Sequence, residues 1–156
     1  MKTILVDEAA TIGFARRVWA ALPDDLAGWT LLLSGELGSG KSTFARALIK
    51  AAGHSGAVPS PTYTLVEPYA LPGITIYHVD LYRIADEEEL QYLGWSELED
   101  GFRLVEWPDR APDLAELADL ALTLSYEGDG RAAELTGLSQ RGERIATLLA
   151  SADSEY

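Results

Sequence analysis

The first third of the chain alternates between two kinds of apolar pattern. Apolar side chains recur at helical spacing over residues 12–22, and Pro23 ends this pattern. Residues 31–33 are three consecutive leucines, a compact run that is typical of a buried strand. Helical spacing returns over residues 44–49, and Gly53 supplies a stop. The pattern therefore predicts a helix, a buried strand and a second helix in this order.

The rest of the chain reads mainly as strands. The predicted elements are an edge strand at 2–6, a hairpin of 64–71 and 74–79 around Pro72-Gly73, a short helix opened by 86–89, a strand at 102–107, a hairpin of 119–126 and 131–138, and a helix at 138–149. We expect one domain over residues 1–150 and a disordered C-terminal tail over 151–156. Strands that alternate with helices predict an α/β fold.

Composition narrows the class of protein. A chain of 156 residues is long enough for one domain with a real core. It has no cysteine and only two histidines, so neither disulfides nor a zinc centre are expected. No apolar run reaches membrane length and the N-terminus turns acidic too early for a signal peptide, so we expect a cytoplasmic protein with no membrane partner. Twelve basic against 25 acidic residues give a net charge of −13, which opposes direct binding to nucleic acid.

Residues 35–42, GELGSGKS, carry the strongest chemical signal. They match G-x-x-x-x-G-K-[ST] between a predicted strand and a predicted helix, which is the context of a P-loop. Glycines allow backbone N–H groups to approach phosphate oxygens, and the helix N-terminus adds donors and a positive dipole. Lys41 is expected to reach the β and γ phosphates, and the Ser42 hydroxyl to ligate Mg²⁺. The predicted fold is thus a three-layer P-loop NTPase whose mixed central sheet, a parallel core with antiparallel hairpins, is flanked by helices.

A P-loop also needs an acidic residue at the end of a neighbouring strand. Asp80 and Glu106 each follow an apolar run, so each is expected at the carboxyl end of a strand, where open α/β sheets bind ligands. The residues alone leave open which of them holds the metal. We interpret His78 as a structural residue, and Trp107 either packs near the nucleotide or fills core. Because the chain has no asparagine, the guanine-reading N-K-x-D motif is absent and ATP is favoured over GTP.

Several motifs together resemble one family, the bacterial TsaE (YjeE) proteins, which are small ATPases of tRNA threonylcarbamoyladenosine biosynthesis. The resemblance covers nearly the whole chain and rests on GELGSGKST (35–43), SPTYTLVEPY (60–69), YHVDLYR (77–83) and LVEWPDR (104–110). It implies that the phosphates lie on Gly38, Ser39, Gly40, Lys41, Ser42 and Thr43, with Mg²⁺ on Ser42 and Glu106. It implies catalytic roles for Lys41, Asp80 and Glu106. It further implies a switch-like loop at Thr62 and nucleotide contacts from Thr11 and Arg131.

The resemblance also implies a partner. Members of the family act on a TsaB–TsaD heterodimer, which modifies tRNAs that read ANN codons, and ATP hydrolysis is expected to reset that complex. The charge of −13 agrees with contact to tRNA only through the complex. Two alternatives remain at this point: a small-molecule P-loop kinase, and a binding module that ATP gates without hydrolysis.

Overall fold

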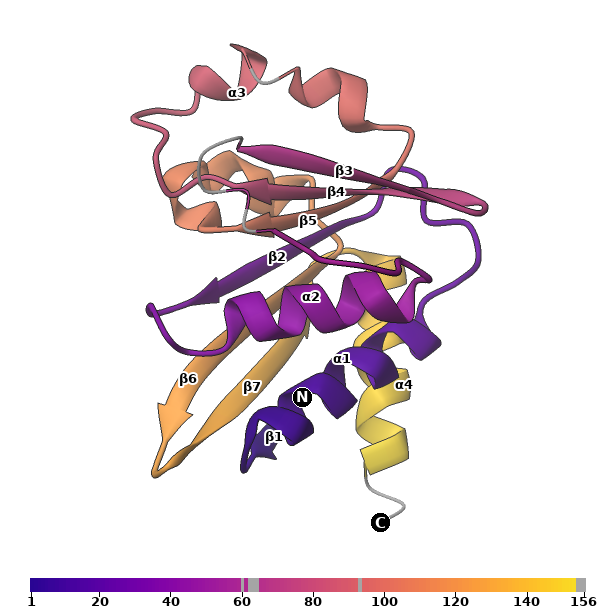
Figure 1. The fold of residues 1–156 in the computed structure, drawn as a ribbon, viewed down its shortest axis with the longest axis vertical. Helices are drawn as coiled ribbons and strands as arrows, with labels where there is room; N and C mark the ends of the chain where they lie inside the picture. Colours follow the sequence, from indigo (N-terminus) through magenta and orange to yellow (C-terminus); the bar gives the residue numbers. More distant parts are fainter. Residues whose placement is uncertain (60, 62–64, 93, 154–156) are drawn as a thin grey trace.

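The computed structural model describes residues 1–59, 61, 65–92 and 94–153. Its elements agree with the predicted order to within a few residues (Figure 1). They are β1 (Lys2–Leu5), α1 (Glu8–Ala21), β2 (Thr30–Gly35), α2 (Lys41–Ala51), β3 (Val66–Leu71), β4 (Ile74–Asp80), α3 (Glu89–Tyr92), β5 (Phe102–Glu106), β6 (Leu120–Glu127), β7 (Gly130–Gly137) and α4 (Gln140–Asp153). Short 3₁₀ turns cover Trp95–Leu98, Pro108–Arg110 and Pro112–Glu116.

The described strands form one seven-stranded mixed sheet in the order β1-β7-β6-β2-β5-β4-β3. Strand β2 lies in the middle and pairs in parallel with both β5 and β6, while β4 pairs in parallel with β5. The pairs β3–β4, β6–β7 and β1–β7 are antiparallel. The predicted combination of a parallel core with antiparallel hairpins is therefore confirmed.

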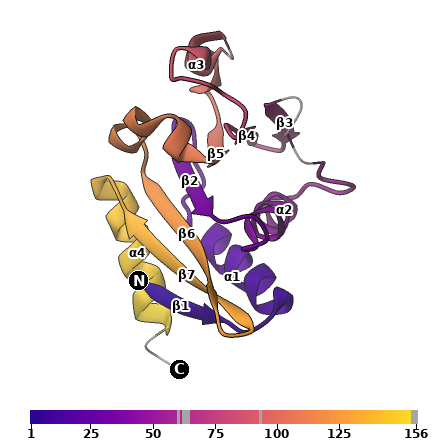
Figure 2. The same cartoon turned by 90° about the vertical axis from the view of Figure 1, so that its left-hand side faces the viewer.

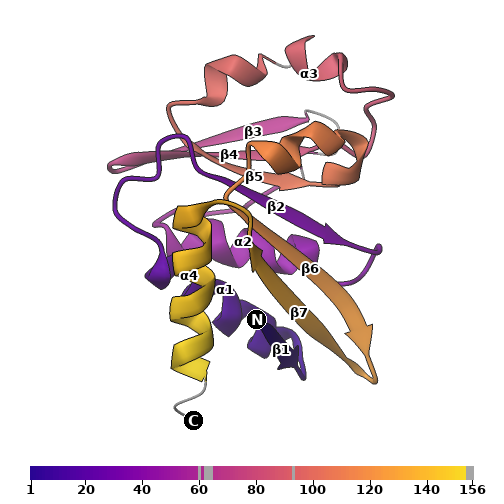
Figure 3. The same ribbon diagram turned by 180° about the vertical axis from the view of Figure 1, so that it is seen from behind.

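Helices cover both faces of this sheet. Helices α1 and α2 pack against each other on one face, and α4 lies on the other (Figures 2 and 3). The apolar side of α1 and α2 is buried, and the rings of Phe14 and Phe44 meet at 6.0 Å between centroids. Asp7 starts α1 by accepting a hydrogen bond from the N–H of Ala10 at 2.8 Å. Leu31 and Leu33 of β2 are wholly buried, as the leucine run predicted.

The C-terminal prediction needs a correction. Helix α4 continues through Asp153, so residues 151–153 are helical and do not belong to a tail. The reason is local: the sequence from Ala146 to Asp153 contains neither glycine nor proline, so nothing stops the helix at residue 150. Residues 154–156 of the expected tail lie outside the described residues.

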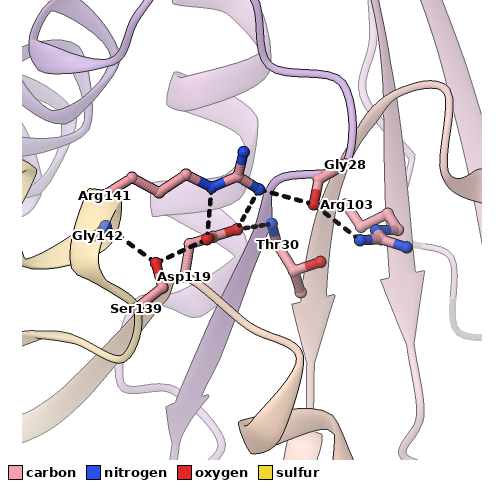
Figure 4. Close-up of polar contacts among 7 residues, drawn as sticks. All are labelled: Gly28, Thr30, Arg103, Asp119, Ser139, Arg141 and Gly142. Atoms are coloured by element: carbon pink, nitrogen blue, oxygen red, sulfur yellow. Dashed lines mark hydrogen bonds and ion pairs between the residues drawn. The ribbon is translucent and has the colours of Figure 1, made fainter.

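A buried carboxylate joins α4 to the start of β2. Asp119 accepts hydrogen bonds from the Thr30 N–H at 3.1 Å, from the Ser139 hydroxyl at 2.7 Å, and from the Nε and Nη2 of Arg141 at 2.7 and 3.1 Å (Figure 4). Ser139 also accepts from the Gly142 N–H at 3.0 Å, which caps the first turn of α4. This network fixes the end of β2 that lies away from the glycine loop.

Candidate functional site

The loop between β2 and α2 has the backbone that its glycines predict. Gly38 has φ of 80° and Gly40 has φ of 106°, a left-handed region that favours glycine. Gly40 directly precedes Lys41, the first residue of α2. A Cβ on Gly38 would lie 2.6 Å from the Tyr126 hydroxyl, so a larger residue there would displace the Tyr126 side chain. The loop therefore ends at the N-terminus of α2, where unpaired N–H groups favour an anion.

The β6–β7 hairpin holds this loop from outside. The Tyr126 hydroxyl donates to the carbonyl of Leu37 at 2.8 Å, and Nη2 of Arg131 donates to the carbonyl of Gly38 at 3.0 Å. The Arg131 guanidinium also lies 4.3 Å from the centre of the Tyr126 ring. Arg131 thus contacts the P-loop backbone, while its predicted contact with a nucleotide stays a prediction. Tyr126 was not predicted, because nothing in its local sequence distinguishes it from an ordinary strand residue.

One cavity of about 330 Å³ brings the predicted residues together. Lys41 and Ser42 reach it from α2, while Asp80 and Glu106 reach it from the ends of β4 and β5. Asp80 and Glu106 are register partners in the parallel pair, so their side chains share a face of the sheet. The complete lining is Leu37, Gly38, Gly40, Lys41, Ser42, Thr43, Asp80, Tyr82, Glu106 and Trp107.

Lys41 lies folded under its own loop. Its Nζ donates to the carbonyls of Gly35 and Glu36, the latter at 3.2 Å. It also lies 4.2 Å from the centre of the Trp107 ring. Burial lowers the pKa of Lys41, and the negative charges of Glu106, Asp80 and Asp109 partly oppose that effect. The ammonium group thus faces the carboxylates from a partly dehydrated position, where an added anion would interact strongly with it.

The two carboxylates are held by different partners. Oδ1 of Asp80 accepts from the backbone N–H of Tyr82 at 2.9 Å. Oε2 of Glu106 lies 2.6 Å from Nε2 of His78, and both side chains are buried. His78 therefore contacts a site residue directly, a position that its local sequence did not reveal. Among the described residues, no cluster of three His, Cys, Asp or Glu side chains is arranged to hold a metal ion by itself.

Trp107 belongs to the cavity and not to the core alone. Its backbone has φ of 58°, which is rare for a non-glycine residue and turns the chain directly after β5. Its ring packs on Tyr82 at 4.9 Å between centroids and on the Lys41 ammonium. Trp107 therefore packs on the ammonium group at the wall of the cavity, and its predicted proximity to a nucleotide stays a prediction.

A second cavity of about 310 Å³ lies on the other side of the glycine loop. Thr11 and Arg131 line it together with Gly38, Gly40 and Thr43, so the two cavities share three residues of the P-loop region. Thr11 and Arg131, for which the resemblance implied nucleotide contacts, therefore lie together beside the glycine loop. The remaining lining residues are Leu5, Asp7, Glu8, Asp129 and Gly130.

Ser39 is a predicted site residue that lines neither cavity. The Ser39 side chain is buried, and its backbone N–H donates to the carbonyl of Glu36 at 3.1 Å, inside the loop. Thr62 lies outside the described residues, so its predicted role stays a prediction.

In the part of the chain that the structure describes, no helix has both the length and the apolar character needed to cross a membrane.

Comparisons with known proteins identify the family of this chain. The model of one family, described as "Threonylcarbamoyl adenosine biosynthesis protein TsaE", matches residues 5–134. The chain belongs to the TsaE family. A protein of Haemophilus influenzae named "tRNA threonylcarbamoyladenosine biosynthesis protein TsaE" is 40% identical over 121 residues, which cover 76% of this chain and 77% of that protein. A protein of the same name from Borreliella burgdorferi is 35% identical over 134 residues, covering 83% and 95% of the two chains.

The fold has a solved counterpart as well. The crystal structure of YdiB from Bacillus subtilis superposes with a TM-score of 0.74 at 25% identity, covering 98% of this chain and 95% of that one. This likeness spans the sheet and the helices on both of its faces. It agrees with the P-loop NTPase fold predicted from the glycine loop.

The donor set of the first cavity fits a nucleoside triphosphate with Mg²⁺. Lys41 and the N-terminus of α2 supply positive charge for phosphates. The Ser42 hydroxyl and the carboxylates of Asp80 and Glu106 supply the hard oxygen ligands that Mg²⁺ prefers. Because Mg²⁺ keeps several waters and commonly binds through one or two carboxylates plus phosphate oxygens, a cage made only of protein groups is not required.

Proposed function

We propose that this TsaE-family protein is a Mg²⁺-dependent ATPase that serves threonylcarbamoyladenosine modification of tRNA. One observation carries the proposal: a single cavity under a P-loop is lined by Lys41, Ser42, Asp80 and Glu106. The names of its relatives supply the pathway, tRNA threonylcarbamoyladenosine biosynthesis. ATP is the proposed nucleotide because the chain has no asparagine to form the N-K-x-D guanine motif.

In this proposal the protein positions the phosphates and stabilises developing charge. Lys41 leaves the carbonyls of Gly35 and Glu36 and binds the terminal phosphate, since an ammonium group gains more from a phosphate than from neutral carbonyls. Ser42 and Glu106 would hold Mg²⁺, which would supply positive charge to the phosphates. Asp80 orients the attacking water or the metal. Thr11 and Arg131 bind the nucleoside side of ATP in the second cavity.

The proposed partner is the TsaB–TsaD heterodimer, and tRNA is contacted only through that complex. The net charge of −13 supports this arrangement, because a strongly acidic protein repels the phosphates of RNA. Hydrolysis would reset the heterodimer between rounds of modification. This role implies a cytoplasmic location.

The deciding experiment measures phosphate release from ATP in the presence of Mg²⁺, first with the protein alone and then with TsaB, TsaD and an ANN-decoding tRNA. We expect the complex to stimulate hydrolysis and repeated modification of tRNA to stop when this protein is omitted. The Lys41→Ala variant serves as the control for contaminating ATPases. The proposed role is wrong if the heterodimer does not change the rate of hydrolysis and if omitting this protein does not change the modification of tRNA.

Two other outcomes point to the alternatives. Tight ATP binding without hydrolysis, even with the heterodimer present, would indicate a nucleotide-gated binding module. Transfer of the γ-phosphate to a metabolite in a substrate screen would indicate a small-molecule kinase.

A further inference from the structure

The pair formed by His78 and Glu106 is unusual in its burial. The exposed fractions of the two residues are 2% and 5%, and Nε2 lies 2.6 Å from Oε2. His78 precedes Asp80 by two residues on β4, so both side chains point to the face of the sheet that Glu106 also occupies. The imidazole therefore reaches the carboxylate from beneath the cavity and not from solvent.

The hydrogen bond assigns the imidazole tautomer. An ionised carboxylate only accepts hydrogen bonds, so Nε2–H of His78 is the donor to Glu106. The other ring nitrogen, Nδ1, is buried and has no hydrogen-bond partner among the described residues. A side chain that only filled space would be better apolar, because a buried nitrogen without a partner destabilises the fold. The polar function of His78 is thus concentrated in its bond to Glu106.

Glu106 also shares the cavity with the ammonium group of Lys41. Burial has the largest effect on the pKa of Lys41 and lowers it. Among the effects that raise this pKa, the negative charge of Glu106 is the largest, so the two charges attract each other. Yet the ion pairs within the described residues include none between Lys41 and Glu106. The hydrogen bond from His78 competes with that ion pair.

We propose that His78 is a positioning residue for the metal site. Its Nε2–H fixes Oε2 of Glu106 and leaves the second carboxylate oxygen, Oε1, to ligate Mg²⁺. This inference rests on the proposed ATPase function. Partners of this kind, which hold a metal-binding carboxylate in place, typically change metal affinity by roughly 10–100-fold when removed.

The test compares variants that keep or remove the donor. His78→Leu removes it at similar volume, whereas His78→Gln places an amide N–H close to the position of Nε2. Titration calorimetry first measures the affinity for ATP without Mg²⁺. Repeating the titration at increasing Mg²⁺ gives the midpoint, which is the Mg²⁺ concentration at which half of the effect of Mg²⁺ on ATP affinity is reached. We expect His78→Leu to raise this midpoint by roughly 10–100-fold without changing Mg²⁺-free binding. His78→Gln should restore most of the loss.

The chain offers a matched control in its only other histidine. His54 lies beyond α2, bonds through Nε2 to the carbonyl of Ala57 at 3.1 Å and packs on Tyr69, away from the cavity. His54→Leu should leave the Mg²⁺ midpoint unchanged. Circular dichroism checks that each variant is folded. If His78→Leu does not fold, His78→Asn replaces it, because its shorter amide ends near the position of Nδ1 and does not reach Glu106.

A double variant separates positioning from a general effect on the fold. Adding His78→Leu to Glu106→Gln should not weaken Mg²⁺ dependence further, since the group that His78 positions is already altered. Additive losses would overturn the inference, as would an unchanged midpoint in the donor-less variant or equal losses with glutamine and leucine. If the wild-type protein shows no Mg²⁺-dependent ATP binding at all, the proposed function fails and this inference with it.

Discussion

Replacing Asp119 with alanine should destabilise the whole domain. The variant removes the acceptor for four hydrogen bonds that join β2, β6 and α4 (Figure 4). The Thr30 N–H loses its acceptor in a residue that is only 1% exposed, which costs about 1–3 kcal/mol. The Arg141 side chain is 44% exposed and regains water, so its lost ion pair adds at most about 1 kcal/mol. With the Ser139 bond, the expected loss is about 3 kcal/mol of unfolding free energy.

Urea denaturation followed by both circular dichroism and tryptophan fluorescence measures this loss. In a thermal melt of a domain of this size, a loss of 3 kcal/mol corresponds to a melting temperature lower by roughly 6–12 °C. Asp24→Ala is the matched control, because Asp24 is exposed, and its effect should stay within about 0.5 kcal/mol. An Asp119→Ala variant as stable as this control would refute the reasoning that the buried network holds α4 to β2.

The same carboxylate predicts a dependence on pH. Burial alone would raise the pKa of Asp119, but hydrogen bonds from Arg141, Ser139 and the Thr30 backbone outweigh it and lower the pKa. A lowered pKa means that the folded protein prefers the ionised form. The stabilisation is therefore fully present above the ordinary aspartate pKa of about 4 and is lost as pH falls further. The stability difference between wild type and Asp119→Asn should shrink in that range.

Three further predictions concern the nucleotide site. Lys41→Ala should lower Mg²⁺-dependent phosphate release by roughly 100-fold or more, since it removes the cation that faces the phosphates; near-wild-type turnover would contradict the P-loop mechanism. Arg131→Ala should raise KM for ATP more than it lowers kcat, because Arg131 contacts the loop carbonyl of Gly38 and lines the second cavity. Steady-state kinetics measure KM and kcat separately. Tyr126→Phe loses one hydrogen bond to the loop and should have a smaller effect. Gly40→Ala should weaken ATP binding in calorimetry because φ of 106° strains a non-glycine residue by about 1–3 kcal/mol; unchanged affinity would show that the loop can rearrange.

Much of this site follows from local sequence. The loop needs residues that adopt positive φ, and the glycines in the sequence indicate these positions directly. The positions of Asp80 and Glu106 were predictable too, because each ends an apolar run and parallel strands carry their ligand sites at their carboxyl ends. The two hairpins were marked by turn residues between β-rich runs.

The pairing of side chains across strands was decided only by the tertiary structure. His78 and Glu106 are 28 residues apart, and Tyr126 and Leu37 are 89 apart, so their contacts depend on strand order and register. No local pattern distinguishes a histidine that fills core from one that binds a carboxylate. The same holds for Asp119, whose partners come from β2 and α4. The sequence by itself determined the backbone chemistry of the P-loop, while the sheet decided which buried polar groups meet, because hydrogen bonds require contact in space.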